Sequence, residues 1–281
     1  MQTNNKRQIR LMQTLLLTAM FAGAYYLDAP SPTTLTKPTT AAYPNLVNYR
    51  SPDTTVEDMP DFASIHDVGQ KKQTFFDFLQ PYIDAKNAEV RQQRRRLQYL
   101  TSKIKLGARL RQDENVFLWE LARHYDVQTD DIHDPGFLDR LLRRVDVLPP
   151  SLVLAQAANE SAWGTSRFAQ EGNNLFGQWC YTQGCGLVPV RRRADANHEV
   201  KSFPSIEESV NAYFQNLNTF PSYQGMRVIR QELRQGAKPI DGISLTQGLT
   251  EYSERGDAYI QDLQAMIYKN NLLARDKTLY P

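Results

Sequence analysis

A proline- and threonine-rich segment at residues 28–60 confines the folded part of this chain to the residues that follow it. The segment holds six prolines and seven threonines and shows no apolar periodicity. Such a stretch cannot bury enough apolar surface to offset the entropy lost on ordering, and its prolines keep it extended. We therefore interpret residues 28–60 as a linker and expect a compact fold only after it.

The residues before the linker have the pattern of an export signal. Three basic residues lie within the first ten positions, and an apolar stretch follows at residues 11–27. A positive flank followed by an apolar segment directs a chain across the inner membrane, and Ala22-Gly23-Ala24 suits cleavage by a signal peptidase. The sequence predicts a signal peptide or an N-terminal membrane anchor at residues 1–27 and a periplasmic protein.

The amino-acid composition limits the kinds of protein that this chain can be. The 281 residues are 41% hydrophobic, which supplies a sizeable core, and their formal net charge of +2 argues against a dedicated nucleic-acid binder. The charge is uneven, because residues 86–111 hold nine basic residues and one acid. We interpret this basic stretch as a solvated helix face, with contact to an anionic surface as the alternative.

Helical periodicity dominates the residues after the linker. Apolar residues recur at spacings of three and four at residues 75–83, 116–125 and 137–145. The basic stretch lies between the first two of these helices. We therefore predict a helical region over residues 61–147, with no catalytic constellation in it.

The informative residues lie in the second region, residues 148–281. An alanine-rich helix is predicted over residues 152–163, and its small side chains suit a central buried helix. Glu160 lies near the C-terminal end, with Gln156 and Ala157 on its face. Partial burial and the negative end of the helix dipole would raise the carboxyl pKa, and a protonated carboxyl can act as a general acid. The alternative is a solvated glutamate that faces sideways.

A loop and a small sheet are expected after this helix. Residues 173–186 combine asparagine, glycine and aromatics, which suit either turns or a sugar-binding cleft. Residues 187–193 and 198–203 have the pattern of short strands, and Ser205 with Glu208 forms a capping box that opens another helix. A buried helix, a small β-lobe and further helices are therefore expected around Glu160.

At these residues the chain resembles a known family. Leu148-Pro-Pro-Ser-Leu-Val-Leu-Ala-Gln-Ala-Ala-Asn-Glu-Ser-Ala-Trp-Gly-Thr-Ser, together with Asn174-Leu-Phe-Gly, is similar to the glucosaminidase domain of glycoside hydrolase family 73. Gly177-Gln-Trp-Cys and Cys185-Gly-Leu-Val-Pro resemble the Bax-like proteins of Gram-negative bacteria more closely. The resemblance implies an α+β, mostly α, lysozyme-like domain at residues 148–281 with a small β-lobe. It also implies cleavage of the β-1,4 bond after N-acetylglucosamine in peptidoglycan, with Glu160 as the catalytic acid.

One departure from the family concerns the second carboxylate. Flagellar members carry a second glutamate before the strand that ends at the position of Phe203, but residues 190–193 hold no acid here. The nearest carboxylates, Glu171, Asp195 and Glu199, are interpreted as solvated loop or strand residues. Attack by a loosely held water and attack by the N-acetyl group of the substrate both stay open, as do retention and inversion.

Substrate contacts are expected from aromatic and amide side chains in several segments. A tyrosine combines a flat apolar face with a hydroxyl, which suits a sugar ring, whereas aromatics at helical spacing can equally fill the core. The candidate substrate-binding residues are Trp163, Asn174, Phe176, Trp179, Tyr213, Tyr252 and Tyr259.

The two cysteines are expected to form a disulfide. Cys180 and Cys185 would need two more ligands to make a structural zinc site, and an exported protein favours a disulfide over free thiols. The scattered histidines and the lack of a phosphate-binding loop predict neither a metal nor a cofactor. We expect a monomer that acts on peptidoglycan glycan strands, with inner-membrane association through the N-terminus and no nucleic-acid partner.

Three functions are compatible with the sequence. The leading one is a peptidoglycan hydrolase. A lytic transglycosylase shares the lysozyme-like fold and needs a single catalytic glutamate. A cell-wall-binding or scaffold protein without turnover is the third.

Overall fold

The computed structural model describes residues 59–190, 192 and 197–279. The predicted signal or anchor at residues 1–27 and nearly all of the predicted linker at residues 28–60 lie outside these residues. Within the described part, no helix is both long enough and apolar enough to span a membrane.

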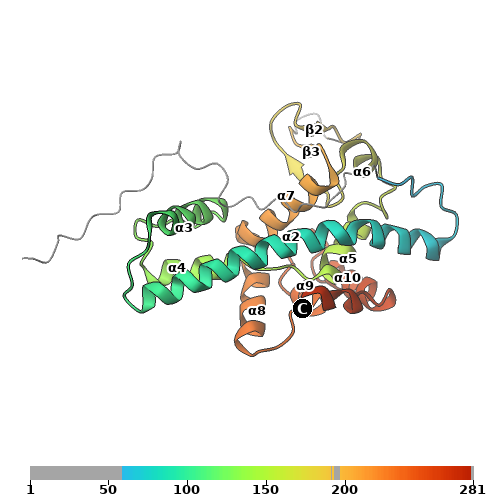
Figure 1. The fold of residues 1–281 in the computed structure, drawn as a ribbon. Helices are drawn as coiled ribbons and strands as arrows, with labels where there is room; N and C mark the ends of the chain where they lie inside the picture. Colours follow the sequence, from blue (N-terminus) through green and yellow to red (C-terminus); the bar gives the residue numbers. More distant parts are fainter. Residues whose placement is uncertain (1–58, 191, 193–196, 280–281) are drawn as a thin grey trace, which may run out of the picture. The chain divides into compact units, whose positions relative to one another are not determined.

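The described chain is mostly helical and carries a small antiparallel sheet, which confirms the predicted fold class (Figure 1). Its elements in chain order are α2 (Val68–Lys105), α3 (Gln112–His124), α4 (Pro135–Arg144), α5 (Pro150–Glu160), α6 (Arg167–Gly172), β1 (Trp179–Cys180), β2 (Gly186–Leu187), β3 (Glu199–Lys201), α7 (Ile206–Thr219), η1 (Pro221–Tyr223), α8 (Gln224–Gln235), α9 (Gly242–Thr246), α10 (Asp257–Lys269) and η2 (Leu272–Leu279).

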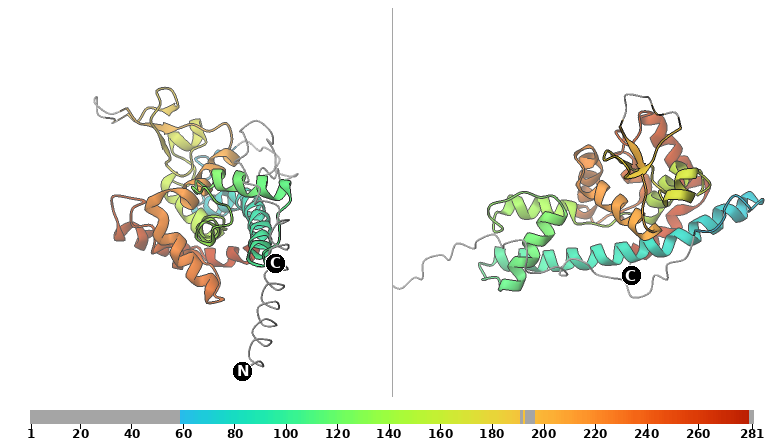
Figure 2. Two further views of the ribbon diagram at one scale, coloured as in Figure 1. Left: turned by 90° about the vertical axis from the view of Figure 1, so that its left-hand side faces the viewer. Right: turned by 90° about the horizontal axis from the view of Figure 1, so that it is seen from above.

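Helix α2 contributes to two hydrophobic clusters. Its N-terminal half, through residues such as Phe75 and Leu79, shares a core with α5, α7 and α10. Its C-terminal half, through Leu97 and Leu100, shares a second core with α3 and α4, which Figures 1 and 2 show at that end of α2. The first core therefore joins residues from both predicted regions of the chain.

Most of the basic stretch is helical, which corrects its predicted place between two helices. Val90, Leu97 and Leu100 recur at helical spacing beneath the basic residues and are buried, so α2 runs on to Lys105. The stretch is also only partly solvated. The guanidinium of Arg94 donates to the carbonyl oxygen of Val145 at 2.8 Å, and its side chain is mostly buried.

Helix α5 lies in the centre of the first core. All its residues from Pro150 to Ala158 are buried, and it contacts α2, α9, α10 and η2. The helix ends at Glu160, three residues earlier than predicted, because the backbone then turns left-handed, with φ of 51° at Ala162, 60° at Trp163 and 74° at Gly164. A Cβ atom at Gly164 would lie 2.5 Å from the ring of Phe62.

The β-lobe is a three-stranded antiparallel sheet in the order β1-β3-β2. Val200 in the central strand pairs with Trp179 on one side and Leu187 on the other. Strand β3 lies within the predicted strand at residues 198–203 but is shorter, β2 shares only Leu187 with the predicted strand at residues 187–193, and β1 was not predicted at all. A Cβ atom at Gly186 would lie 1.9 Å from the carbonyl oxygen of Val200, so only glycine permits this close pairing.

The C-terminal segment η2 holds the start of α5 through Asp276. The backbone N–H of Ser151 donates to the Asp276 carboxylate at 2.8 Å, and the Ser151 hydroxyl donates to it at 2.6 Å. Burial raises the pKa of Asp276 to about 6, although the hydrogen bonds from Ser151 oppose the shift.

This raised pKa predicts a specific pH dependence of stability. Between pH 6 and pH 4 the folded protein holds a proton on Asp276 that the unfolded chain has released, so the contribution of this residue to stability rises as pH falls through 6. We expect the free energy of unfolding of wild type, relative to Asp276→Asn, to rise by about 2 kcal/mol from pH 7 to pH 4. Urea unfolding of both proteins across this range measures it, and a constant difference would contradict it.

Candidate active site

Glu160 is the last residue of α5 and is half-buried at the edge of the first core. The turn that follows is tied back to the helix, because the Ser161 hydroxyl donates to the carbonyl oxygen of Ala157 at 2.6 Å and accepts from the backbone N–H of Gly164 at 2.8 Å. Left-handed backbone at non-glycine residues is uncommon and tends to cluster at functional sites. This turn fixes the backbone position from which the Glu160 side chain extends.

Gly177 lies next to the carboxylate of Glu160 and has no side chain to fill the space beside it. A Cβ atom at Gly177 would lie 3.4 Å from Glu160 Oε2, and the φ of 63° at this residue also favours glycine. The loop that carries Gly177 is held by Asn174, whose amide donates to the carbonyl oxygens of Gln178 and Lys201, both at 2.8 Å. Asn174 is buried, so the structure places this candidate as a support for the loop.

A chain of buried hydrogen bonds ends at Tyr259, close to Glu160. The Tyr213 hydroxyl donates to the side-chain oxygen of Gln156, and Gln156 Nε2 donates to the Tyr259 hydroxyl at 2.9 Å. Tyr259 lies close enough to Glu160 for the carboxylate charge to raise the pKa of the phenol, and Asn159 Nδ2 donates to Glu160 Oε1 at 3.1 Å. The hydrogen bond from Asn159 orients the carboxylate.

Four tyrosines lie close enough to Glu160 to sense its charge. Burial first, and then the negative charge of Glu160, raise the pKa of Tyr259 above its ordinary range. Burial also raises the pKa of Tyr213, Tyr252 and Tyr223, and the Glu160 charge adds to each shift. Tyr223 was missed by the sequence reading, since it lies in the short η1 turn, where no apolar period marks it.

The structure brings four of the predicted aromatic residues together beside Glu160. The ring of Phe176 stacks on Tyr213 with centroids 4.0 Å apart, and the ring of Tyr252 stacks on Tyr259 with centroids 5.5 Å apart. The Tyr252 hydroxyl donates to the carbonyl oxygen of Phe176 at 3.0 Å. Phe176, Tyr213 and Tyr259 are buried, whereas Tyr252 is half-buried. We call these four rings, which lie close to Glu160, the tyrosine wall.

The two predicted tryptophans lie in different surroundings. Trp163 packs edge-to-face on Phe75 and Phe76 of α2, with centroids 5.9 and 5.3 Å away, so its ring supports the turn after Glu160. Trp179, in the β-lobe, stacks one face on His198 at 4.3 Å and leaves 55% of its surface exposed. Among the candidate aromatics, Trp179 is therefore the ring most open to a ligand.

The carboxylates considered for a second catalytic role are engaged elsewhere or lie outside the described residues. Glu199 is buried rather than solvated, which corrects the sequence reading. It accepts the backbone N–H groups of Gly184 at 3.0 Å and Gly186 at 2.8 Å, and these donors lower its pKa. Glu171 is exposed and pairs with Arg167 at 3.3 Å, and Asp195 lies outside the described residues.

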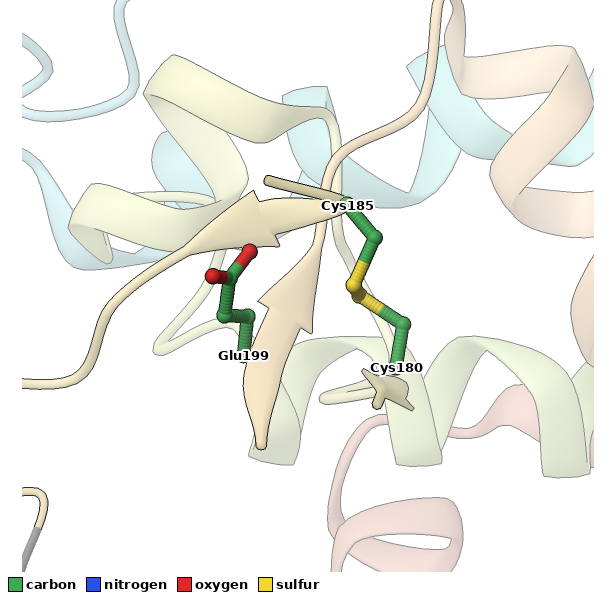
Figure 3. A group of neighbouring side chains, drawn as sticks. All are labelled: Cys180, Cys185 and Glu199. Atoms are coloured by element: carbon green, nitrogen blue, oxygen red, sulfur yellow. A yellow bond between two sulfur atoms is a disulfide. The ribbon is translucent and has the colours of Figure 1, made fainter. Parts of the chain in front are cut away.

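The predicted disulfide is present between Cys180 and Cys185. Figure 3 shows it beside Glu199, and the two sulfur atoms and a carboxylate oxygen lie within 4.8 Å of one another. Because the sulfur atoms are bonded to each other and both carboxylate oxygens accept backbone N–H groups, the cluster holds the loop between β1 and β2 in place.

This arrangement predicts that the native protein has no free thiol. Labelling of the denatured, non-reduced chain should find none, and labelling after reduction should find two. We expect reduction to cost at most about 2 kcal/mol of stability, because the loop that the bond closes is short. The Cys180→Ser/Cys185→Ser double variant should reproduce that loss, and two labelled thiols without reductant would contradict the prediction.

Comparisons with known proteins agree with this architecture. The family described as mannosyl-glycoprotein endo-β-N-acetylglucosaminidase, a glucosaminidase domain, matches residues 137–272. The chain is 33% identical over 215 residues to Protein bax of Escherichia coli (strain K12), a match that covers 76% of this chain and 75% of that protein. No solved structure matches. A glucosaminidase domain implies glycosidase activity, and this chain belongs to the family of glucosaminidase-domain proteins that includes Protein bax.

Proposed function

We propose that this protein is a periplasmic peptidoglycan hydrolase that cleaves the β-1,4 bond after N-acetylglucosamine, with Glu160 as the general acid. One observation carries the proposal. The Glu160 carboxylate lies at the end of a buried helix, is oriented by a hydrogen bond from Asn159, and has Gly177, which lacks a side chain, next to it. The glucosaminidase family supports the type of bond, and the predicted export signal supports peptidoglycan as the polymer.

In this mechanism Glu160 delivers its proton to the glycosidic oxygen as the bond from that oxygen to the anomeric carbon breaks. The bond electrons leave with the oxygen, and the sugar ring acquires oxocarbenium character. Either a water molecule or the carbonyl oxygen of the N-acetyl group on the same sugar then attacks the anomeric carbon. We favour the N-acetyl group, because Glu199, the described acid of the β-lobe, already accepts two backbone N–H groups. Water completes hydrolysis and returns a proton to Glu160.

The engagement of Glu199 also keeps a lytic transglycosylase as the second candidate. A transglycosylase needs a single acid, and the hydroxyl at carbon 6 of the muramyl residue attacks in place of water. The product is then an anhydro-muramyl end instead of a reducing end.

Digestion of purified sacculi with the full chain tests the proposal. Mass spectrometry of borohydride-reduced fragments should find reduced N-acetylglucosamine at the new ends. Anhydro-muramyl ends would establish the transglycosylase. Binding to sacculi without release of soluble fragments would indicate the wall-binding protein. If the protein releases glycans from a mannosyl glycoprotein and leaves sacculi undigested, its substrate is that glycoprotein and not peptidoglycan.

The tyrosine wall yields a kinetic prediction. Tyr252→Phe removes the hydroxyl that holds the carbonyl of Phe176, and Tyr213→Phe removes the donor that orients Gln156. Losing one hydrogen bond of a positioning network costs about 1 kcal/mol, so we expect turnover to fall about fivefold in each variant. Initial rates on sacculi measure the effect.

Two comparisons make this result specific. Thermal midpoints of both variants should fall by no more than about 4 °C, the loss expected for one hydrogen bond in a folded region of this size. Tyr268→Phe, on the exposed face of α10, should cut at the wild-type rate. If both wall variants cut normally, or if lost activity follows lost stability, the wall has only a packing role.

A further inference from the structure

A pocket lies near the opposite end of α5 from Glu160. It is a cavity of about 340 Å³ between α2, α4 and α8, lined among others by Arg94, Arg143, Arg234 and Gln231. Asp146, which also lines it, precedes α5 by four residues. Since α5 rises about 1.5 Å per residue over its length, this pocket is about 15 Å or more from the catalytic carboxylate. It is therefore separate from the site described above.

The charges at this pocket do not balance. Arg94, Arg143 and Arg234 line it, and Arg230 lies buried behind it, 3.9 Å from the Asp146 carboxylate. Against these four positive charges stand the carboxylates of Asp146 and of Asp139, which also lines the pocket. Asp146 is already shared, because Arg234 donates to both of its oxygens at 2.6 Å and Arg94 lies 3.2 Å away. At this pocket four arginines therefore lie beside two carboxylates, an excess of positive charge.

Hydrogen-bond donors at the pocket also lack acceptors. The Nε of Arg94 is buried and has no hydrogen-bond partner in the described structure. Arg143 uses its Nε to donate to Gln231 Oε1 at 2.6 Å, and no acceptor among the described residues takes its two terminal nitrogens. A buried donor without a partner costs free energy, so such groups usually have an occupant to satisfy them. Burial, together with the charge of Arg234, already lowers the pKa of Arg94, although Asp146 opposes this.

We propose that this pocket is an oxyanion-binding site that takes a carboxylate or phosphate group. Guanidinium groups present planar forks of N–H donors that match such groups in geometry and charge. A metal cation would be repelled by the surplus positive charge, and an apolar ligand would leave the donors unpaired. The side-chain amide of Gln231 adds a further neutral donor beside Arg143. The proposal does not depend on the activity proposed above.

Titration calorimetry of the full chain tests this site. The two probes are inorganic phosphate and the tripeptide Glu-Glu-Ala, each at constant ionic strength set with sodium chloride. We expect one bound anion per chain and weaker binding as the salt concentration rises. Binding of phosphate alone identifies phosphate as the ligand group, and binding of the tripeptide alone identifies a carboxylate. Failure of both probes to bind at millimolar concentration would overturn the proposal.

Three variants locate the binding. Arg143→Gln removes a charge and the donors aimed at the ligand, and it should weaken binding at least about tenfold. Gln231→Glu can still accept from Arg143 but adds a negative charge to the pocket, and it should weaken binding similarly. Arg140→Gln, on the same helix but outside the pocket and paired with Asp134, is the matched control. Wild-type affinity in both pocket variants, or an equal loss in the control, would overturn the assignment.

Discussion

Replacing Glu160 by glutamine is expected to lower the rate of sacculus digestion by about 100- to 10,000-fold with little change in the fold. The amide keeps an oxygen that can accept from Asn159, so the hydrogen bond that orients the side chain is retained. It has no acidic proton to give to the leaving oxygen. Initial rates of fragment release from sacculi measure the effect, with circular dichroism to establish that the fold is kept.

Glu171→Gln provides the matched control for this experiment. Glu171 is also close to the site in sequence, but it is exposed and pairs only with Arg167 in the described structure. We expect this variant to digest sacculi at the wild-type rate. If Glu160→Gln digests sacculi as fast as wild type, Glu160 is not the acid. If Glu171→Gln loses activity as well, the second carboxylate has to be sought in α6.

Replacing Asp146 by alanine is expected to destabilise the protein strongly. Asp146 is 2% exposed and is the shared counter-charge of Arg94, Arg230 and Arg234. Burial alone would raise its pKa, but the charge of Arg230 and the hydrogen bonds from Arg234 outweigh burial, and the pKa lies below its ordinary value. Removing the carboxylate leaves buried guanidinium groups without compensation, which costs about 3 to 5 kcal/mol.

Thermal unfolding measures this loss. For a folded region of this size we expect the midpoint to fall by about 6 to 20 °C. Asp139→Ala is the control, because Asp139 lines the same pocket but is exposed and forms no ion pair in the described structure. It should shift the free energy of unfolding by less than about 0.5 kcal/mol. An unchanged midpoint in Asp146→Ala would mean that the arginines find other partners.

Local features of the sequence were sufficient to predict several elements. The capping residue Ser205 and the apolar period after it correctly predicted α7, because a helix start depends on side chains within one turn. The buried character of α5 followed from its run of small apolar residues. The disulfide followed from two cysteines close together in one loop, where the choice of partner is trivial.

Other features depend on contacts between residues far apart in the sequence. The full length of α2 was not predicted, because in its C-terminal half the charged side chains outnumber the apolar residues that α3 and α4 cover. The sequence could not show that Glu199, on β3, holds the loop between β1 and β2, because its partners there are the backbone N–H groups of Gly184 and Gly186. The order of side chains along a sequence does not show which backbone groups will become hydrogen-bond partners.

The sequence by itself determined the family, the fold class and the position of Glu160 on a buried helix, because these depend on local periodicity and on a contiguous motif. Only the tertiary structure decided which groups surround Glu160. Tyr259, on α10, lies close enough to sense its charge, and Gly177, in the loop after α6, lies next to its carboxylate, although they are about 100 and 17 positions away along the chain. Contacts act over a few ångströms in space, and only packing brings residues so distant in sequence within that range.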